Sequence, residues 1–245
     1  MKVIFFKQNK NSKLNTFFVN IIIAVVVSLV GVVSFISPAI SVSYLKENKA
    51  IYQGNIEEKN VSLMINVYWG TEYIEPMLDV LLSNNCSATF FVGGSWVAQN
   101  NNTFDLILAS NCEIGNHGYN HKDHAKISKN ANIEEISNTH KLVKNLADID
   151  MKLFAPPSGS FNNTTLDVAN SLGYKTIMWS KDTIDWRDKN SDLIFTRATK
   201  NLSNGDLILM HPTKETLNAL DKIIKEIKKQ GYNIVTVSKN IQGVI

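Results

Sequence analysis

Short apolar strands alternate with amphipathic helices over most of this chain. Seven runs rich in β-branched and aromatic residues are predicted to be strands: Ser62–Val67, Ala88–Val92, Glu113–Asn116, Lys152–Ala155, Lys175–Trp179, Asp206–Met210 and Asn233–Val237. Between them, apolar residues recur at helical spacing, most clearly at Leu217, Leu220, Ile223, Ile224 and Ile227. This alternation indicates an α/β fold with a parallel sheet and right-handed crossovers. Seven strands fit an incomplete parallel (β/α) barrel better than a doubly wound sheet.

The N-terminal part of the chain has a different pattern. Four lysines within the first 13 residues precede an apolar run, Phe17–Ile40, that is long enough to span a bilayer core of about 30 Å. We therefore predict a basic cytoplasmic tail at 1–15, a transmembrane anchor at 16–42, a linker at 43–60 and a domain at 61–245. The lysines before the span place the domain on the extracytoplasmic side. A cleaved signal peptide ending near Ser37-Pro38-Ala39 is the alternative.

Charge and composition narrow the possible functions only a little. The formal net charge of +3 is too small to indicate a nucleic-acid partner. No glycine-rich phosphate loop opens a helix, which argues against dinucleotide binding. Cys86 and Cys112 each precede a predicted strand, and they are either a disulfide or two separate thiols. Nothing in the pattern indicates an oligomeric state.

Histidines concentrate where the predicted strands end. In parallel barrels, the carboxyl ends of the strands carry the active site. His117 and His121 follow the third strand and His211 follows the sixth. If residues 117–121 form a helical turn, both imidazoles face the same way and can reach one Zn²⁺, although a pair at this spacing is weak support for a metal.

Other candidate residues follow the same strand ends. Aromatic and proline side chains there are predicted to line a sugar-binding groove: Tyr68, Trp69, Tyr119, Pro157 and Trp186. Asp182 and Asp185 either orient a neighbouring group or belong to a solvated loop.

Five segments together resemble the polysaccharide deacetylase family, also described as the NodB homology domain or carbohydrate esterase family 4. They are the second strand Ala88–Val92, Glu113–His121 with its His-x-x-x-His spacing, Phe154–Gly159, Trp179–Trp186 and Leu207–His211. Three stretches, Asn66–Gly70, Phe154–Ser160 and Ile208–Thr213, resemble in detail the sporulation-associated, YlxY-like branch, which is similarly membrane-anchored. The resemblance implies a NodB-like barrel that acts on N-acetylated cell-wall or spore glycan such as peptidoglycan.

The resemblance also implies roles for individual residues. His117 and His121 would bind the metal, Ser158 would supply a backbone N–H to the oxyanion, and His211 would protonate the leaving amine, oriented by Asp182 or Asp185. The family's first strand ends in two aspartates, one a general base and one a metal ligand. Here those positions are Tyr68 and Trp69. The family also has an arginine that orients the general base, and its position here is Ala155.

Two principal hypotheses follow from these departures. In the first, the chain is a degenerate member that binds glycan in the inherited cleft and hydrolyses the amide poorly or not at all. In the second, it is an active metal-dependent deacetylase in which Glu72 replaces a lost carboxylate as ligand or base. Glu72 is equally well explained as a first-turn helix residue that the helix dipole favours. A third possibility is a membrane scaffold that does not use the cleft.

Overall fold

The computed structural model describes residues 10–36 and 48–244, which belong to two separate units. The first contains helix α1 (Lys10–Ile36), whose side chains are described from residue 15 to residue 29. The predicted anchor at 16–42 overlaps this helix, and its last six positions lie outside the described residues. Among the residues that the structure describes, no helix is long and apolar enough to cross a membrane. The anchor therefore remains a prediction without structural support.

The second unit is built on a curled parallel sheet. Its strands are β1 (Asn60–Val67), β2 (Thr89–Val92), β3 (Glu113–Asn116), β4 (Leu153–Phe154), β5 (Lys175–Thr176), β6 (Lys181–Asp182), β7 (Leu207–Met210) and β8 (Asn233–Ile234). They pair in the order β5-β4-β3-β2-β1-β7-β6, while β8 pairs with the first two residues of β1. This arrangement confirms the predicted incomplete parallel barrel.

Two predicted strands need correction. The run Asn233–Val237 is a strand only at Asn233–Ile234, and a short helix begins at Val237. The run Lys175–Trp179 pairs with β4 only at its first two residues, and a separate strand, β6, then pairs with β7. The sequence pattern did not indicate β6, because its two residues are both charged.

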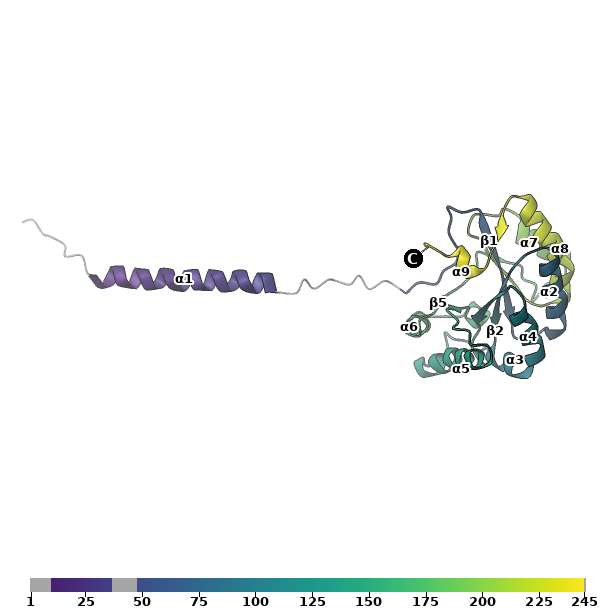
Figure 1. Ribbon diagram of the computed structural model, residues 1–245, viewed down its shortest axis with the longest axis horizontal. Helices are drawn as coiled ribbons and strands as arrows, with labels where there is room; N and C mark the ends of the chain where they lie inside the picture. The colour runs from purple at the N-terminus through teal and green to yellow at the C-terminus, as the bar shows by residue number, and fades with distance from the viewer. Residues whose placement is uncertain (1–9, 37–47, 245) are drawn as a thin grey trace, which may run out of the picture. The chain divides into compact units, whose positions relative to one another are not determined.

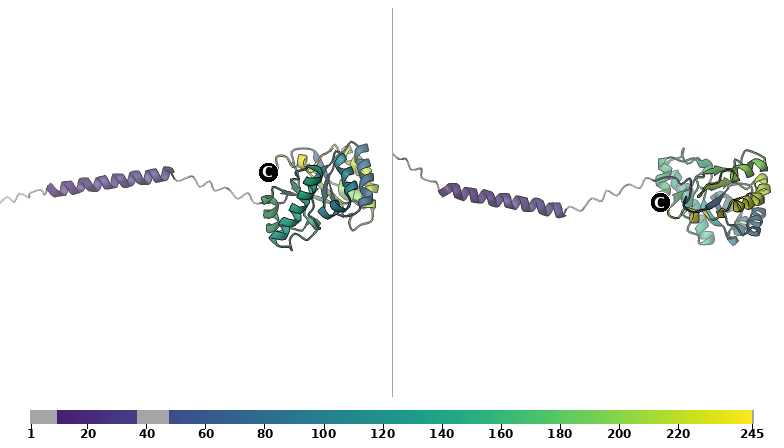
Figure 2. Two further views of the ribbon diagram at one scale, coloured as in Figure 1. Left: turned by 60° about the horizontal axis from the view of Figure 1, so that its bottom comes forward. Right: turned by 90° about the horizontal axis from the view of Figure 1, so that it is seen from above.

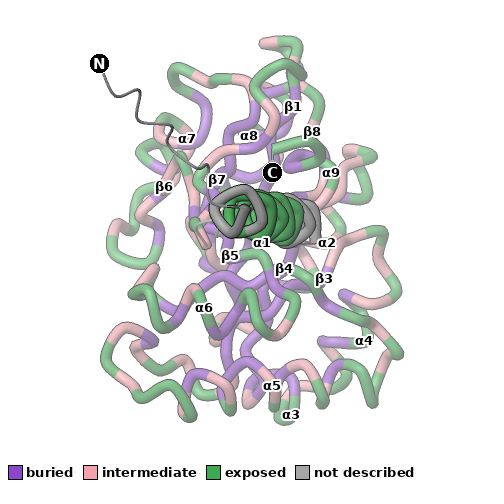
Figure 3. Tube along the Cα trace, turned by 90° about the vertical axis from the view of Figure 1, so that its left-hand side faces the viewer, coloured by how far each residue is buried: buried purple, intermediate pink, exposed green. Residues whose placement is uncertain are grey.

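Helices surround the sheet (Figures 1 and 2). They are α2 (Ile74–Ser83), α3 (Gly94–Gln99), α4 (Asn101–Ala109), α5 (Lys129–Ala147), α6 (Asn163–Ser171), α7 (Ser191–Thr199), α8 (Lys214–Lys229) and α9 (Val237–Asn240), with two 3₁₀ turns, η1 (Thr71–Tyr73) and η2 (Pro157–Gly159). Figure 3 shows buried residues along the central strands and exposed residues on the outer turns of the helices.

The central strand β1 faces two apolar clusters. All eight of its residues are buried, as expected for a parallel strand covered on both sides. Leu63, Ile65 and Val67 pack in the cluster that the helices complete, whereas Met64 packs inside the barrel. Since side chains alternate along a strand, Asn66 points to the same inner side as Met64, where the cavity described below begins.

Residues before β1 lie along the open edge of the barrel. The Ile51 amide donates to the carbonyl of Thr176 (2.9 Å), and the Met178 amide donates to the carbonyl of Ile51 (2.8 Å). Gln53 forms a bridge with Asp206. The folded unit thus includes residues that the sequence pattern assigned to a linker at 43–60.

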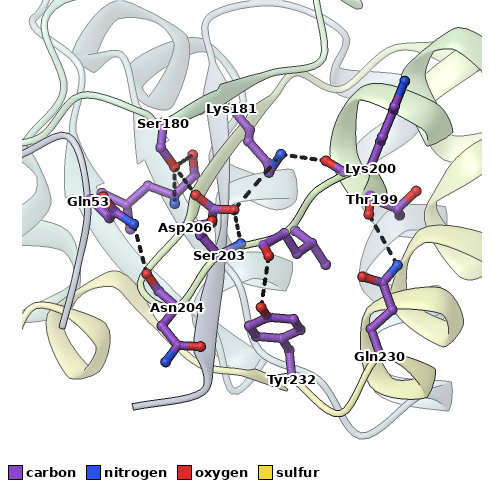
Figure 4. Close-up of polar contacts among 12 residues, drawn as sticks. Gln53, Ser180, Lys181, Thr199, Lys200, Ser203, Asn204, Asp206, Gln230 and Tyr232 are labelled. Atoms are coloured by element: carbon purple, nitrogen blue, oxygen red, sulfur yellow. Dashed lines mark hydrogen bonds and ion pairs between the residues drawn. The ribbon is translucent and has the colours of Figure 1, made fainter. Parts of the chain in front are cut away.

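A buried carboxylate joins β6, β7 and the loop before β7 (Figure 4). Asp206 accepts hydrogen bonds from the Ser180 hydroxyl (2.7 Å) and the Ser203 amide (2.8 Å), and Lys181 Nζ lies 3.9 Å from it. Removing one partner of buried hydrogen bonds leaves the others unsatisfied.

We expect Asp206→Ala to lower the free energy of unfolding by about 2–4 kcal/mol, because the Ser203 amide loses its acceptor and the Ser180 hydroxyl keeps only the Leu207 carbonyl at 3.4 Å. The Lys181 ammonium loses its nearby carboxylate and keeps its hydrogen bond to the Lys200 carbonyl (2.7 Å). Urea denaturation measures this loss. The control is Asp105→Ala on the exposed side of α4, which should change stability by less than about 0.5 kcal/mol. Equal losses in the two variants would contradict the assigned role of Asp206.

Candidate functional site

A cavity of about 550 Å³ lies at the carboxyl ends of the strands. Four of the predicted site residues that line it follow β1 and β3: Tyr68, Trp69, His117 and His121. Four more come from later segments of the chain: Ser158 in η2, Asp182 in β6, Trp186 after β6 and His211 after β7. The structure therefore brings together eight candidate residues that are separated by up to 143 positions in the chain.

The two histidines after β3 are neighbours, but for a different reason from the one predicted. No helix forms at residues 117–121. Instead the chain turns through left-handed conformations at Gly118 (φ 72°) and His121 (φ 54°). The imidazole rings of His117 and His121 meet edge to face with centroids 5.1 Å apart.

Helix α5 holds the loop that carries these histidines. The buried carboxylate of Glu135 accepts hydrogen bonds from the amides of Tyr119 (2.9 Å) and Asn120 (2.7 Å). One turn earlier, Asn132 Oδ1 lies 2.6 Å from His124 Nδ1, and its amide donates to the His124 carbonyl. Both ends of the loop are thereby tied to one face of α5.

His117 is fixed as a neutral imidazole. Its Nδ1 donates to the carbonyl of Ala155 (2.7 Å), so its Nε2 carries the lone pair. Burial, followed by the nearby His121, lowers the pKa of His117 from 6.5 to about 3. Burial also lowers the pKa of His121. The backbone carbonyl of Ala155 thus orients His117.

This pKa predicts a pH dependence of stability. Because the folded-state pKa of His117 is about 3 and the unfolded value is 6.5, the unfolded chain binds the proton first as the pH falls, and stability is lost across that interval. Unfolding free energies measured at about pH 7 and about pH 4.5 should differ less in His117→Gln than in the unmodified chain. The same difference in both proteins would contradict a neutral, buried His117.

Aromatic rings occupy the two positions where the family has aspartates. The Tyr68 ring packs against His121 (centroids 4.9 Å apart), and its hydroxyl accepts a hydrogen bond from Ser95 (3.2 Å). A Cβ at Gly93 would come within 2.5 Å of the Tyr68 ring, so the lack of a side chain there makes room for it. The Trp69 indole stacks on His211 with centroids 5.6 Å apart and planes 10° apart.

Asp185 is the residue that orients His211. One oxygen of its buried carboxylate lies 2.8 Å from His211 Nδ1, and the other accepts from the His211 amide (2.6 Å) and the Thr216 hydroxyl (2.6 Å). Asp182 instead accepts from the Ile184 amide (2.7 Å) and faces the cavity. The two aspartates, which the sequence could not tell apart, have different surroundings.

Four predicted residues are absent from the cavity lining: Asp185, which lies behind His211, and Glu72, Tyr119 and Pro157. Glu72 is exposed in the first turn of η1, the position that the helix dipole favours. The Tyr119 ring lies against Gly94 at the start of α3, and Pro157 is buried at the start of η2. Ser158, the next residue, has φ 54° and does reach the cavity.

Sequence reasoning missed four lining residues: Asn66, Gly159, Trp179 and Leu209. Asn66 and Leu209 belong to strands. Because side chains alternate between the two faces of a strand, this alternation could have predicted that both residues point into the barrel. Asn66 is buried, and its Oδ1 has no hydrogen-bond partner among the described residues. Trp179 ends one of the predicted strands, and that position at the functional edge of the sheet was the signal that could have found it.

The lining residues do not fit the family's three-ligand metal centre. His117 Nε2 is available as a donor atom, and His121 adjoins it. Trp69, which has no donor atom for a metal, stands in place of the third ligand. Within residues 10–36 and 48–244, no group of three histidine, cysteine or acidic side chains is placed to hold a metal ion. Zinc at His117 and His121 therefore remains a prediction.

Comparison with known sequences agrees with this fold and site. The sequence profile for polysaccharide deacetylases matches residues 53–177. The uncharacterized protein YlxY of Bacillus subtilis is 38% identical over 208 residues, which are 85% of this chain and 65% of YlxY. A peptidoglycan-N-acetylglucosamine deacetylase of Bacillus cereus is 35% identical over 176 residues, 68% of this chain and 81% of that protein. The chain belongs to the polysaccharide deacetylase family, carbohydrate esterase family 4, in a YlxY-like branch.

Solved structures of the family include one without activity. A carbohydrate esterase family 4 pseudoenzyme from Bacillus anthracis matches with a TM-score of 0.78 and 34% identity, over 83% of this chain and 72% of that chain. A mutant of that pseudoenzyme, described as having restored enzymatic activity, matches with a TM-score of 0.78 and 33% identity, over 83% and 75% of the two chains.

Proposed function

We propose that this protein binds N-acetylated cell-wall or spore glycan in the cavity and hydrolyses its acetamido groups poorly or not at all. The observation that carries the proposal is the packing of Tyr68 on His121 and of Trp69 on His211. The rings stand where the family has its base and third metal ligand. A general base contributes about 10²–10⁴-fold to a rate, so losing it together with a metal ligand leaves a weak hydrolase.

Features of the cavity support retained glycan binding. Trp69 and Trp186 are 43% and 57% exposed and line its opening, where they can stack on sugar rings. His117, Ser158 and His211 keep polar groups at the cavity wall. Aromatic walls with a few convergent polar groups are typical of small-ligand sites.

The placement of Glu72 does not favour the alternative of an active deacetylase. That function needs a carboxylate near His117 and His121, and Glu72 is exposed outside the lining of the cavity. Asp182 does line the cavity, but it belongs to β6, which β7 separates from β1, the strand of the lost aspartates.

Two parts of the proposal rest on the sequence alone: the anchor on the apolar run after the N-terminal lysines, and the link to sporulation on the resemblance to the YlxY-like branch. We propose that the N-terminal segment holds the domain at the outer face of a membrane, and that the protein acts during sporulation. The scaffold alternative predicts that mutating Trp69, Tyr119 and His211 together leaves function in cells intact, whereas glycan binding in the cavity predicts its loss.

Calorimetric titration of the full-length chain with N-acetylglucosamine tetramers tests the binding function. We expect Trp69→Ala and Trp186→Ala each to weaken binding about tenfold through lost stacking. Leu82→Ala, which removes an apolar side chain that is 75% exposed on α2, is the matched control and should bind normally. No binding, or equal binding by all four proteins, would contradict glycan binding in the cavity.

A further inference from the structure

The cavity has an unbalanced set of charges. Among the residues that line it, Asp182 is the one carboxylate, and neither lysine nor arginine is present. At the position where the resemblance leads us to expect an arginine, the side chain is the buried methyl group of Ala155. The metal ion that would add positive charge lacks its full set of ligands. A neutral sugar can only donate hydrogen bonds to this carboxylate, whereas a cationic sugar can also pair its charge with it.

Asp182 is held in place and is accessible. Its Oδ1 accepts from the Ile184 amide (2.7 Å), which fixes the side chain across the left-handed turn at Ile184 (φ 54°). No hydrogen bond to its Oδ2 is found within residues 48–244. The guanidinium group of Arg187 lies over the Trp186 ring, 5.8 Å from its centroid, and pairs with Asp188 through two contacts of 2.8 and 3.1 Å, so its charge is already compensated. Asp182 therefore keeps acceptor capacity for a ligand.

The walls around Asp182 also favour a cation. Trp69, Trp179 and Trp186 all line the cavity. The face of an indole ring attracts a positive charge, and this attraction grows when the cation is partly desolvated. The same faces pack on the apolar side of a sugar ring, so one ligand can satisfy the carboxylate and the indoles together.

We propose that the sugar residue that occupies the cavity carries a free, protonated amine, that is, a deacetylated hexosamine within an otherwise N-acetylated glycan. This inference rests on the proposed glycan binding and names the sugar that the site selects. A protein of this kind would recognise the product of the deacetylation that its relative from Bacillus cereus is named for.

The test compares ligands that differ only in acetylation. The full-length chain is titrated with glucosamine tetramers and with N-acetylglucosamine tetramers at the same salt concentration. We expect the amino form to bind about tenfold more tightly, the effect of one well-placed charge pair near a protein surface. Asp182→Asn should abolish this preference, while Asp105→Asn, which removes an exposed carboxylate from α4, should leave it unchanged.

The possible outcomes separate the two proposals. Binding of the N-acetylated tetramer as tightly as the amino form would overturn the inference and leave the proposed function standing, whereas no binding of either would overturn both. Equal binding of a linear polyamine such as spermine would show that charge alone is recognised and would also overturn it. Binding that requires added Zn²⁺ and is lost with a chelator would assign the cavity to a metal instead.

Discussion

Restoring the two carboxylates in a Tyr68→Asp/Trp69→Asp variant should raise the rate of acetate release from N-acetylglucosamine oligomers by about 10²-fold or more over the unmodified chain. The first substitution returns a general base beside His121. The second returns a third metal ligand next to His117 and His121 and removes the indole stacked on His211. His211, held by Asp185, and the loop at Ser158 are already in place.

The matched control for this prediction is Tyr68→Asn/Trp69→Asn. It opens the same space without returning a carboxylate, so its activity should stay at the level of the unmodified chain. Bound zinc, measured by elemental analysis, should reach about one ion per chain in the aspartate variant, which would have the three protein ligands typical of catalytic zinc. An aspartate variant that binds zinc and is no faster than its asparagine control would refute the assignment of these positions. Adding Ala155→Arg tests whether the base also needs its arginine.

The largest loss of stability is expected for Gly70→Ala. Gly70 has φ 73°, and a Cβ there would lie 1.9 Å from the backbone oxygen of Pro212, directly after His211. Neither backbone can move away without disturbing the stack of Trp69 on His211. We expect the free energy of unfolding to fall by about 4 kcal/mol or more, which guanidinium denaturation would measure.

Gly173→Ala is the control that separates the backbone strain of a positive φ from the steric clash of a Cβ with neighbouring atoms. Gly173 has φ 79°, but a Cβ there would have no atom within 4 Å. Its replacement should cost only the strain of a left-handed alanine, about 1–2 kcal/mol. Similar losses at the two glycines would show that contact with Pro212 does not constrain the loop after β1.

The fold could be predicted from the sequence because the apolar pattern is strong. The strand β1 carries an unbroken apolar run from Leu63 to Ile65 with Val61 and Val67 on either side, and α8 keeps one apolar stripe over four turns. Strand β6 could not be predicted, since Lys181 and Asp182 pair with β7 through backbone atoms and carry no apolar signal.

The site was predicted in part for a similar reason. His117, His121 and His211 could be selected because each follows the end of a predicted strand. In a parallel barrel the carboxyl ends of all strands lie at the same edge. Position after a strand end was not enough to separate Asp182 from Asp185, since that difference depends on which carboxylate the loop after β6 directs toward His211. The pair His117 and His121 was found with the wrong local structure: a left-handed turn held by Glu135 replaces the helical turn.

Acetate release by the unmodified full-length chain, with zinc supplied and an active family deacetylase assayed alongside, tests most directly the claim that Tyr68 and Trp69 replace the catalytic carboxylates. The substrate is an N-acetylglucosamine tetramer, and released acetate is quantified enzymatically. Because the rings at these two positions leave the site without a general base, we expect a rate at least about 10²-fold below that of the active enzyme. A rate equal to that of the active enzyme would contradict the account.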